Sequence, residues 1–203
     1  MSFKKFYIRP MDDFILYTKM GLNHVLDFSA YDHILFLIVL AAVFKTREWR
    51  KVLWLVTFFT IGHSLTLGLS AYGVVKVPVD VVEFLIPLTI FITAAVNVLN
   101  TKEISSKSNS INLLFSGVFG LIHGLGFSNY FRLMIGLEED KLMPLIEFAL
   151  GIEIAQIVVV ISILLLGYIL KNFFNVKNRD WIIVTSSIVI GFAIQMMAER
   201  VFW

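Results

Sequence analysis

The stretch from Val52 to Gly73 reads VLWLVTFFTIGHSLTLGLSAYG and contains no Asp, Glu, Lys or Arg. A predominantly apolar segment of about 20 residues is long enough to cross the hydrocarbon core of a bilayer as an α-helix. Inside that core the backbone has to satisfy its own hydrogen bonds, which a helix does. The imidazole of His63 lies near the middle of the stretch. The sequence therefore predicts a transmembrane helix that carries an ionisable group into the membrane.

Other apolar runs of the same character occupy residues 31–44, 79–100, 111–127, 144–170 and 181–202. Of the 203 residues, 58% are hydrophobic and only 16% are charged, and the mean hydropathy of +0.84 lies far above that of a water-soluble domain. We therefore predict an all-α, polytopic helical membrane protein in contact with the lipid bilayer. Nothing resembles a linker between domains, so residues 1–203 are expected to form a single transmembrane helical domain.

The number of membrane crossings depends on residues 11–30, where the apolar stretches FILY and GLNHVL are interrupted by charged side chains. If this segment spans, the protein has seven transmembrane helices, and if the segment lies in the interface it has six. Lys and Arg accumulate in short cytoplasmic loops. The connections 45–51, 101–110 and 171–180 hold four, two and three basic residues and are therefore expected to be cytoplasmic. A seventh span would bring the basic N-terminal segment to the same side. We predict seven helices in the cell (inner) membrane with a cytoplasmic N-terminus.

Charge and cysteine content exclude several functions. The formal net charge of +2 is too small and too dispersed to indicate a nucleic-acid partner. Cysteine is absent, so disulfides, thiolate metal ligands and thiol nucleophiles are excluded. Because nearly the whole chain is assigned to membrane helices, no soluble catalytic domain fits. Any chemistry has to come from polar side chains within the membrane.

The ionisable residues of the apolar segments are expected in the middle or the outer half of the membrane on this topology. They are His24, Asp27, Asp32, His33, His63, Glu83, His123, Glu147, Glu153 and Glu199. A charged side chain at the bilayer centre costs roughly 2.5–3.5 kcal/mol on insertion scales, so such groups usually face a partner or a cavity. Imidazole and carboxylate ligands together suit Ni²⁺, Co²⁺ and Zn²⁺. Because the ten ionisable residues are expected at one depth, they predict a shared polar site for a divalent metal ion.

Helical periodicity indicates which of these side chains share a face. Thr60 and His63 are three residues apart, as are Glu153 and Gln156, so each pair lies on one side of its helix. Glu147 and Glu153 lie about 120° apart around their helix, so both cannot face one centre without distortion. We favour Glu153, because Glu147 is close enough to the membrane boundary to be hydrated. Glycines in the stretch around His123 predict close helix packing there.

Several sequence blocks hold most of these polar residues: YDHILFL (31–37), TFFTIGHSLTL (57–67), VEFLIPLTI (82–90) followed by Asn97, FGLIHGLGF (119–127) and FALGIEIAQ (148–156). In these blocks the chain resembles the HupE/UreJ family of small membrane proteins. The resemblance implies a permease for nickel or cobalt. Carried over by position, it implies polar site residues His24, Asp32, His33, His63, Ser64, Glu83, His123, Glu153 and Gln156.

Both lines of inference lead to one expected site. Its metal ligands are predicted to be His24, Asp32, His33, His63, His123 and Glu153, with Ser64, Glu83, Glu147 and Gln156 in support. The expected function is transport of Ni²⁺ or Co²⁺ through this site. One alternative is an intramembrane zinc-dependent hydrolase in which Glu153 acts as general base on a metal-bound water. Another is a metal-free accessory subunit whose polar cluster holds helices together. Partner membrane proteins or a homo-oligomer are possible on any of these readings.

Overall fold

The computed structural model describes residues 10–27, 29–100, 109–136, 138 and 140–202. Within these ranges the chain forms seven α-helices and one short 3₁₀ helix, with no strand. The helices are α1 (Pro10–Leu26), α2 (Asp32–Ala42), the 3₁₀ helix η1 (Thr46–Glu48), α3 (Trp49–Ala71), α4 (Val79–Leu99), α5 (Asn109–Met134), α6 (Leu142–Phe173) and α7 (Asn178–Glu199). The predicted all-α fold with seven helices is confirmed.

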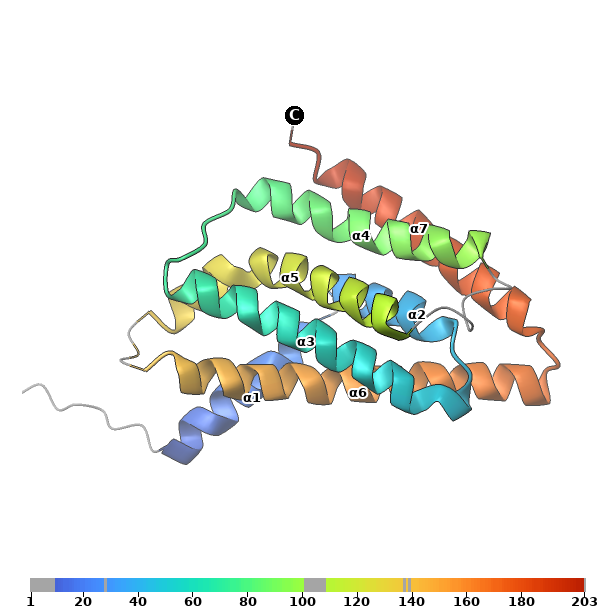
Figure 1. Ribbon diagram of the computed structural model, residues 1–203, viewed down its shortest axis with the longest axis horizontal. Coiled ribbons are helices and arrows are strands. Elements are labelled where there is room, and N and C mark those ends of the chain that lie inside the picture. The colour runs from blue at the N-terminus through green and yellow to red at the C-terminus, as the bar shows by residue number, and fades with distance from the viewer. Residues whose placement is uncertain (1–9, 28, 101–108, 137, 139, 203) are drawn as a thin grey trace, which may run out of the picture.

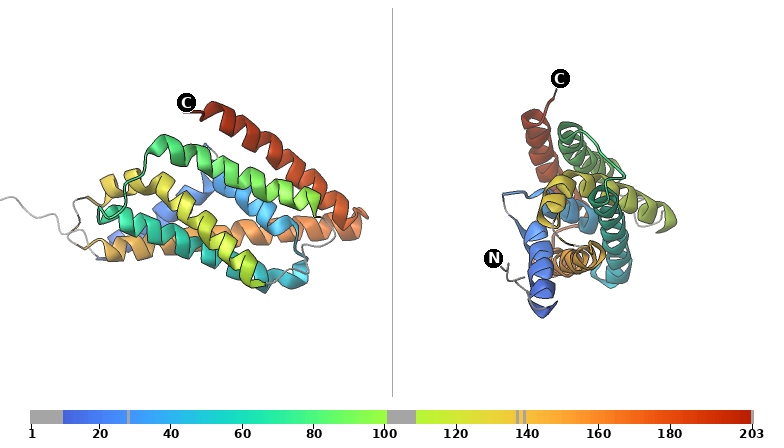
Figure 2. Two further views of the ribbon diagram at one scale, coloured as in Figure 1. Left: turned by 45° about the horizontal axis from the view of Figure 1, so that its top comes forward. Right: turned by 90° about the vertical axis from the view of Figure 1, so that its left-hand side faces the viewer.

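Four segments are long and apolar enough, by length and composition, to cross a membrane: Thr46–Ala71, which includes η1 and α3, and helices α4, α6 and α7. The apolar helix α2 has 11 residues and α1 has 17. At 1.5 Å per residue α2 is only about 16 Å long, so it cannot cross a hydrocarbon core of about 30 Å alone. In Figures 1 and 2, α1 runs from one end of the bundle toward its middle and α2 continues to the other end. The two helices are therefore successive halves of one passage along the bundle.

The remaining helices alternate in direction, which defines two ends of the bundle (Figure 1). The connections 43–48 and 174–177 lie at one end, which we call the α2–α3 end. The connection 72–78 and the start of α1 lie at the other, the α3–α4 end. Helix α5 continues to Met134, beyond the apolar run expected to end at residue 127. The longer helix has a packing reason, because Phe131 on its last turns is completely buried.

Helices α3 and α5 approach each other closely because glycines face the neighbouring backbone. A Cβ added to Gly120 would collide with the carbonyl oxygen of Phe59, and one added to Gly124 would collide with that of His63. Small residues at such positions let two membrane helices pack backbone to backbone. This contact fixes the height of α3 relative to α5, and each of the two helices carries a histidine.

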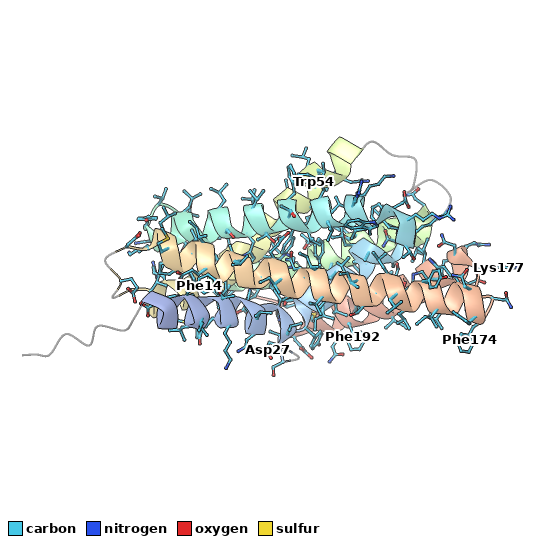
Figure 3. All side chains as sticks on the ribbon, turned by 90° about the horizontal axis from the view of Figure 1, so that it is seen from below. Phe14, Asp27, Trp54, Phe174, Lys177 and Phe192 are labelled. Atoms are coloured by element: carbon cyan, nitrogen blue, oxygen red, sulfur yellow. The ribbon has the colours of Figure 1, made fainter. Side chains whose placement is uncertain are left out.

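Large apolar side chains cover the outside of the bundle. Phe14, Trp54, Phe174 and Phe192 are all more than 40% exposed and project outward in Figure 3. In water such a surface would be unfavourable, whereas lipid tails solvate it. The four histidines instead turn toward the interior, where helices α1, α2, α3 and α5 meet, and Asp32 is buried beside them. Asp27, Glu83 and Glu199, which the sequence also placed within the membrane, are exposed.

Candidate metal centre

Four imidazoles from four helices meet inside the bundle, and we call His24, His33, His63 and His123 the histidine cluster. The ring of His33 lies centrally, with centroid distances of 4.6 Å to His24, 5.7 Å to His63 and 5.4 Å to His123. The rings of His24 and His63 are 5.5 Å apart. One ligand nitrogen from each of His24, His33 and His63 lies within 4.8 Å of the others. The structure thus brings together every histidine of the chain, and a metal ion could be held by the closest three.

The ring nitrogens of the histidine cluster are buried and mostly lack hydrogen-bond partners. His63 is completely buried, and His33 and His123 are 4% and 1% exposed. Within the described ranges, both nitrogens of His63 and the Nε2 atoms of the other three have no partner. A buried polar atom without a partner costs about 1–3 kcal/mol. Several such atoms facing one another are readily explained if a cation binds between them.

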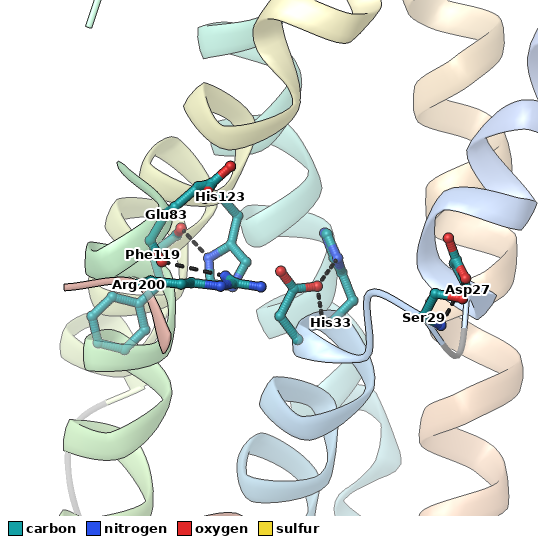
Figure 4. Close-up of polar contacts among 8 residues, drawn as sticks. Asp27, Ser29, His33, Glu83, Phe119, His123 and Arg200 are labelled. Atoms are coloured by element: carbon teal, nitrogen blue, oxygen red, sulfur yellow. Dashed lines mark hydrogen bonds and ion pairs between the residues drawn. The ribbon is translucent and has the colours of Figure 1, made fainter. Parts of the chain in front are cut away.

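Two of the rings are oriented by hydrogen bonds on their far side. His123 Nδ1 lies 2.9 Å from the carbonyl oxygen of Phe119, and His33 Nδ1 lies 3.1 Å from Asp32 Oδ1 (Figure 4). A carbonyl oxygen can only accept, so Nδ1 of His123 carries the proton and Nε2 presents its lone pair. An ionised Asp32 has the same effect on His33. Metal-bound histidines are usually held in this way, with the second nitrogen donating to an oxygen. Both rings therefore present a free Nε2 as ligand.

The cluster lies at the interruption between α1 and α2. His24 occupies the last turn of α1, and Asp32 and His33 occupy the first turn of α2. Discontinuous membrane helices commonly supply the binding site of transporters, where irregular backbone lines a polar cavity. At the break itself, Asp27 Oδ1 accepts the backbone N–H of Ser29 at 2.8 Å and both residues are exposed (Figure 4). The break thus delivers two of the imidazoles and a polar turn to one level of the bundle.

A pocket of about 660 Å³ connects His24 with the surface. Its lining residues are Met20, Asn23, His24, Leu26, Asp27, Ser29, Phe127 and Tyr130. The ring of Phe127 lies 3.9 Å from that of His24, measured between centroids, and covers one face of it. Among the members of the cluster, His24 is the one with intermediate burial. The pocket therefore gives His24 access to the surface of the bundle.

Glu153 is held at the contact between α3 and α6. Its two carboxylate oxygens each accept a hydroxyl hydrogen bond of 2.5 Å, from Thr57 and from Thr60. Thr60 Oγ1 also lies 3.0 Å from Oε1 of the fully buried Gln156. In the part of the chain that the structure describes, Glu153 does not join the group of three ligand atoms. Asp32 is likewise outside that group and contacts His33 instead.

The other expected supporting residues occupy different environments. Ser64, next to His63, has a buried hydroxyl for which the described residues provide no partner. Glu147 is partly exposed on α6. Glu83 is exposed on α4, and its backbone carbonyl accepts a hydrogen bond of 3.3 Å from Arg200 (Figure 4). Of these three, Ser64 is the one whose neighbour in the chain belongs to the histidine cluster.

The aromatic surroundings of the cluster and the threonine partners of Glu153 were not predicted from the sequence. The rings of Phe59 and Phe36 lie 5.1 Å and 5.5 Å from that of His123. Each of these phenylalanines lies three or four residues from a histidine on its own helix, a spacing that places both on one face. Thr57 and Thr60 have the same three-residue spacing. These spacings in the sequence are the signal that could have predicted both features.

Apolar helices around a buried group of imidazoles define a polytopic membrane protein with a site suited to a metal ion. A family model described as HupE / UreJ protein matches residues 3–200. The chain therefore belongs to the HupE/UreJ family, as its sequence motifs predicted. Comparison with curated proteins and with solved structures gave no match.

Proposed function

We propose that this protein is a permease for a divalent transition-metal ion, Ni²⁺ or Co²⁺, and that the histidine cluster binds the ion during transport. The observation that carries the proposal is that one ring nitrogen from each of His24, His33 and His63 lies within 4.8 Å of the others, while the buried Nε2 atoms of these residues lack partners in the described structure. Neutral imidazole suits these borderline ions. Family membership supports the same function.

The cluster is slightly wider than a metal site with its ion bound. Metal–nitrogen bonds of about 2.0–2.1 Å place the ligands of a tetrahedral site about 3.3 Å apart. The three nitrogens lie within 4.8 Å of one another, so they have to move closer together when the ion binds. His123 is the natural fourth ligand, because its ring lies 5.4 Å from that of His33 and its Nε2 is free. In this proposal Asp32 positions His33, and Glu153 lies beside the site.

The geometry favours transport over hydrolysis. A hydrolase of the kind considered from the sequence needs a free carboxylate beside the metal to act as general base. Glu153 instead lies outside the group of three ligand nitrogens and accepts hydrogen bonds from the hydroxyls of Thr57 and Thr60. The interrupted α1–α2 passage is the arrangement that transporters use to build ion sites. We therefore assign the cluster a role in ion passage.

We propose that the basic connections at the α2–α3 end face the cytoplasm in the cell (inner) membrane. The expectation of a cytoplasmic N-terminus assumed that residues 11–30 cross the membrane separately. Helices α1 and α2 run in the same direction, so α1 begins at the end opposite the basic connections (Figure 1). A cytoplasmic N-terminus and cytoplasmic basic connections therefore cannot both be correct. We retain the cytoplasmic location of the connections. The basic N-terminal residues Lys4, Lys5 and Arg9, and most of the connection 101–110, lie outside the described residues.

Uptake of radioactive nickel and cobalt into proteoliposomes tests the proposal. The native protein is expected to accumulate at least one of the two ions, and His63→Ala and His123→Ala are expected to reduce uptake to background. Gln195→Ala, an exposed position on α7, serves as the matched control and is expected to transport normally. Native protein that accumulates neither ion would overturn the proposal. A stoichiometric zinc retained by such inactive protein would point to the hydrolase.

A further inference from the structure

A second cavity lies on the other side of the histidine cluster, toward the α2–α3 end. It has a volume of about 260 Å³ and lies between α2, α4 and α5. Most of its wall is apolar and includes Ile92, Val96 and Phe115, which are also exposed on the outside of the bundle. Its polar side chains include Thr93, Asn97, Asn112 and Ser116. This cavity has no part in the site described above, so its purpose requires a separate explanation.

Three helices show the same order of residues between the histidine cluster and this cavity. At intervals of about one turn the order is His33, Phe36 and Val39 on α2; His63, Phe59 and Leu55 on α3; and His123, Phe119 and Ser116 on α5. Residues three or four apart share a helix face. Each helix therefore presents a histidine, a phenylalanine and a cavity residue in succession along one face.

The three phenylalanines pack together as a layer, which we call the phenylalanine layer. The ring of Phe36 stacks on that of Phe59 at 4.8 Å and meets that of Phe119 edge-on at 5.9 Å. On the histidine side, the ring of Phe59 lies 5.1 Å from that of His123 and 6.1 Å from that of His63. On the other side, Phe119 lines the cavity. Phe36 and Phe59 are 1% and 0% exposed, so these rings are buried between the histidine cluster and the cavity.

The cavity offers neutral oxygens of the kind that accept a hydrated cation. Asn97 donates through Nδ2 to the Val39 carbonyl at 2.7 Å, a bond that leaves its amide oxygen to act as an acceptor. The Ser116 hydroxyl donates to the Leu55 carbonyl at 2.6 Å and keeps lone pairs for other donors. Six waters occupy about 180 Å³ at about 30 Å³ each. The cavity of about 260 Å³ can hold an ion with its first water shell.

We propose that this cavity is the inner half of the ion path, where the ion is rehydrated, and that the phenylalanine layer is the gate between it and the histidine cluster. This inference rests on the proposed transport function. Rings packed across a pore exclude water and ions, as hydrophobic constrictions do in channels. The ion leaves its imidazole ligands when the layer opens and enters a compartment that has only neutral oxygens to bind it, which favours release.

Thiol labelling tests the gate directly, because the native chain contains no cysteine. Thr93→Cys places a single thiol on the cavity wall at a partly exposed position. Sealed vesicles of known orientation are treated from one side at a time with a charged, membrane-impermeant thiosulfonate. We expect labelling from the α2–α3 side only. Adding Phe59→Ala is expected to permit labelling from both sides. From the side opposite the α2–α3 end, the extent of labelling should rise at least about tenfold over that of the Thr93→Cys parent.

Phe58→Ala is the matched control, since Phe58 is the neighbour of Phe59 on α3 but is 38% exposed on the outside of the bundle. It is expected to leave one-sided labelling unchanged. If Phe59→Ala fails to fold, Phe59→Leu and Phe36→Leu test the same layer with smaller changes. Labelling of the parent from both sides or from neither would overturn the proposal, as would one-sided labelling in every layer variant. If the native protein took up neither Ni²⁺ nor Co²⁺, the proposed transport function would be overturned instead. The labelling pattern would still decide whether the phenylalanine layer is a barrier.

Discussion

The carboxylate of Asp32 contacts His33, the residue that follows it, in two ways: Oδ1 lies 3.1 Å from the ring Nδ1 and accepts the backbone N–H at 2.8 Å. The residues are 8% and 4% exposed, so water does not compete effectively for this oxygen. The carboxylate at the first position of α2 therefore selects the tautomer in which His33 Nδ1 carries the proton and Nε2 presents its lone pair. In the proposed metal site, the Asp-His motif would supply a ligand together with the group that positions it.

Asp32→Ala removes this positioning group, so metal binding should weaken without being abolished. Loss of a carboxylate that holds a metal-bound histidine typically costs 10–100-fold in affinity. We expect a fall of that size for Ni²⁺ in equilibrium dialysis of the purified protein. Asp27→Ala is the control, because Asp27 is exposed and bonds to Ser29 at the break. Complete loss of binding in Asp32→Ala would show that Asp32 is itself a ligand, and unchanged affinity would contradict a positioning role.

His63→Leu should separate metal binding from folding. His63 is completely buried and both of its ring nitrogens lack partners among the described residues, so leucine removes an uncompensated cost of about 1–3 kcal/mol. We expect the metal-free variant to be at least as stable as the native protein. The native protein should gain about 2.7 kcal/mol when the ion is present at 100 times its dissociation constant. The variant should gain nothing.

Thermal unfolding in detergent, with and without Ni²⁺ or Co²⁺, measures both effects of His63→Leu. The native protein is expected to show a metal-dependent rise in melting temperature that the variant lacks. Gln195→Ala provides a reference that keeps the histidine cluster intact. A metal-dependent rise of equal size in His63→Leu would place the binding site elsewhere.

Much of the fold follows from the sequence because apolar length and period determine membrane helices directly. The run 79–100 became α4 (Val79–Leu99) almost without change. The relation between α1 and α2 could not be predicted in the same way. The short segment DFSAY (27–31) fits a loop between two spans as well as an interruption within one. Only the packing of α1 and α2 against the other helices distinguishes these cases.

The candidate site likewise has features that the sequence predicts and features that it does not. The common depth of the histidines followed from their places in the apolar runs, and the structure places their rings next to one another. The role of Glu153 did not follow, because its neighbours Thr57 and Thr60 belong to a different helix, distant in the sequence. Periodicity gives the face on which a side chain lies but not what the opposing helix presents to it.

Gly120→Ala should destabilise the protein by forcing α3 and α5 apart. The added methyl group would collide with the Phe59 carbonyl oxygen, and overpacking of this kind typically costs about 1–3 kcal/mol. Since the same contact sets the positions of His63 and His123, metal affinity should also fall. Gly191→Ala on α7 is the matched control, because a Cβ there meets nothing within 4 Å. It should be neutral or slightly stabilising, as alanine is the better helix former.

Melting temperature and Ni²⁺ affinity of the two glycine variants provide the measurement. We expect a lower melting temperature and a lower Ni²⁺ affinity for Gly120→Ala, and no fall in either quantity for Gly191→Ala. If Gly120→Ala kept the native melting temperature, α3 and α5 would not be in backbone contact as described.

Glu153→Gln discriminates between a ligand and a neighbour of the site. The structure places the Glu153 carboxylate between the hydroxyls of Thr57 and Thr60, outside the group of three ligand nitrogens, so Ni²⁺ affinity measured by dialysis should change less than about threefold. Stability should fall instead, because hydrogen bonds to a charged group contribute about 1.5–3 kcal/mol. A double-mutant cycle with Thr60→Val should show a coupling of about 0.5–3 kcal/mol, whereas a cycle with Ser162→Ala on the exposed face of α6 should show none. A loss of Ni²⁺ affinity of a hundredfold or more in Glu153→Gln would instead make Glu153 a ligand, as the sequence predicted, reached by movement of α6 toward the cluster.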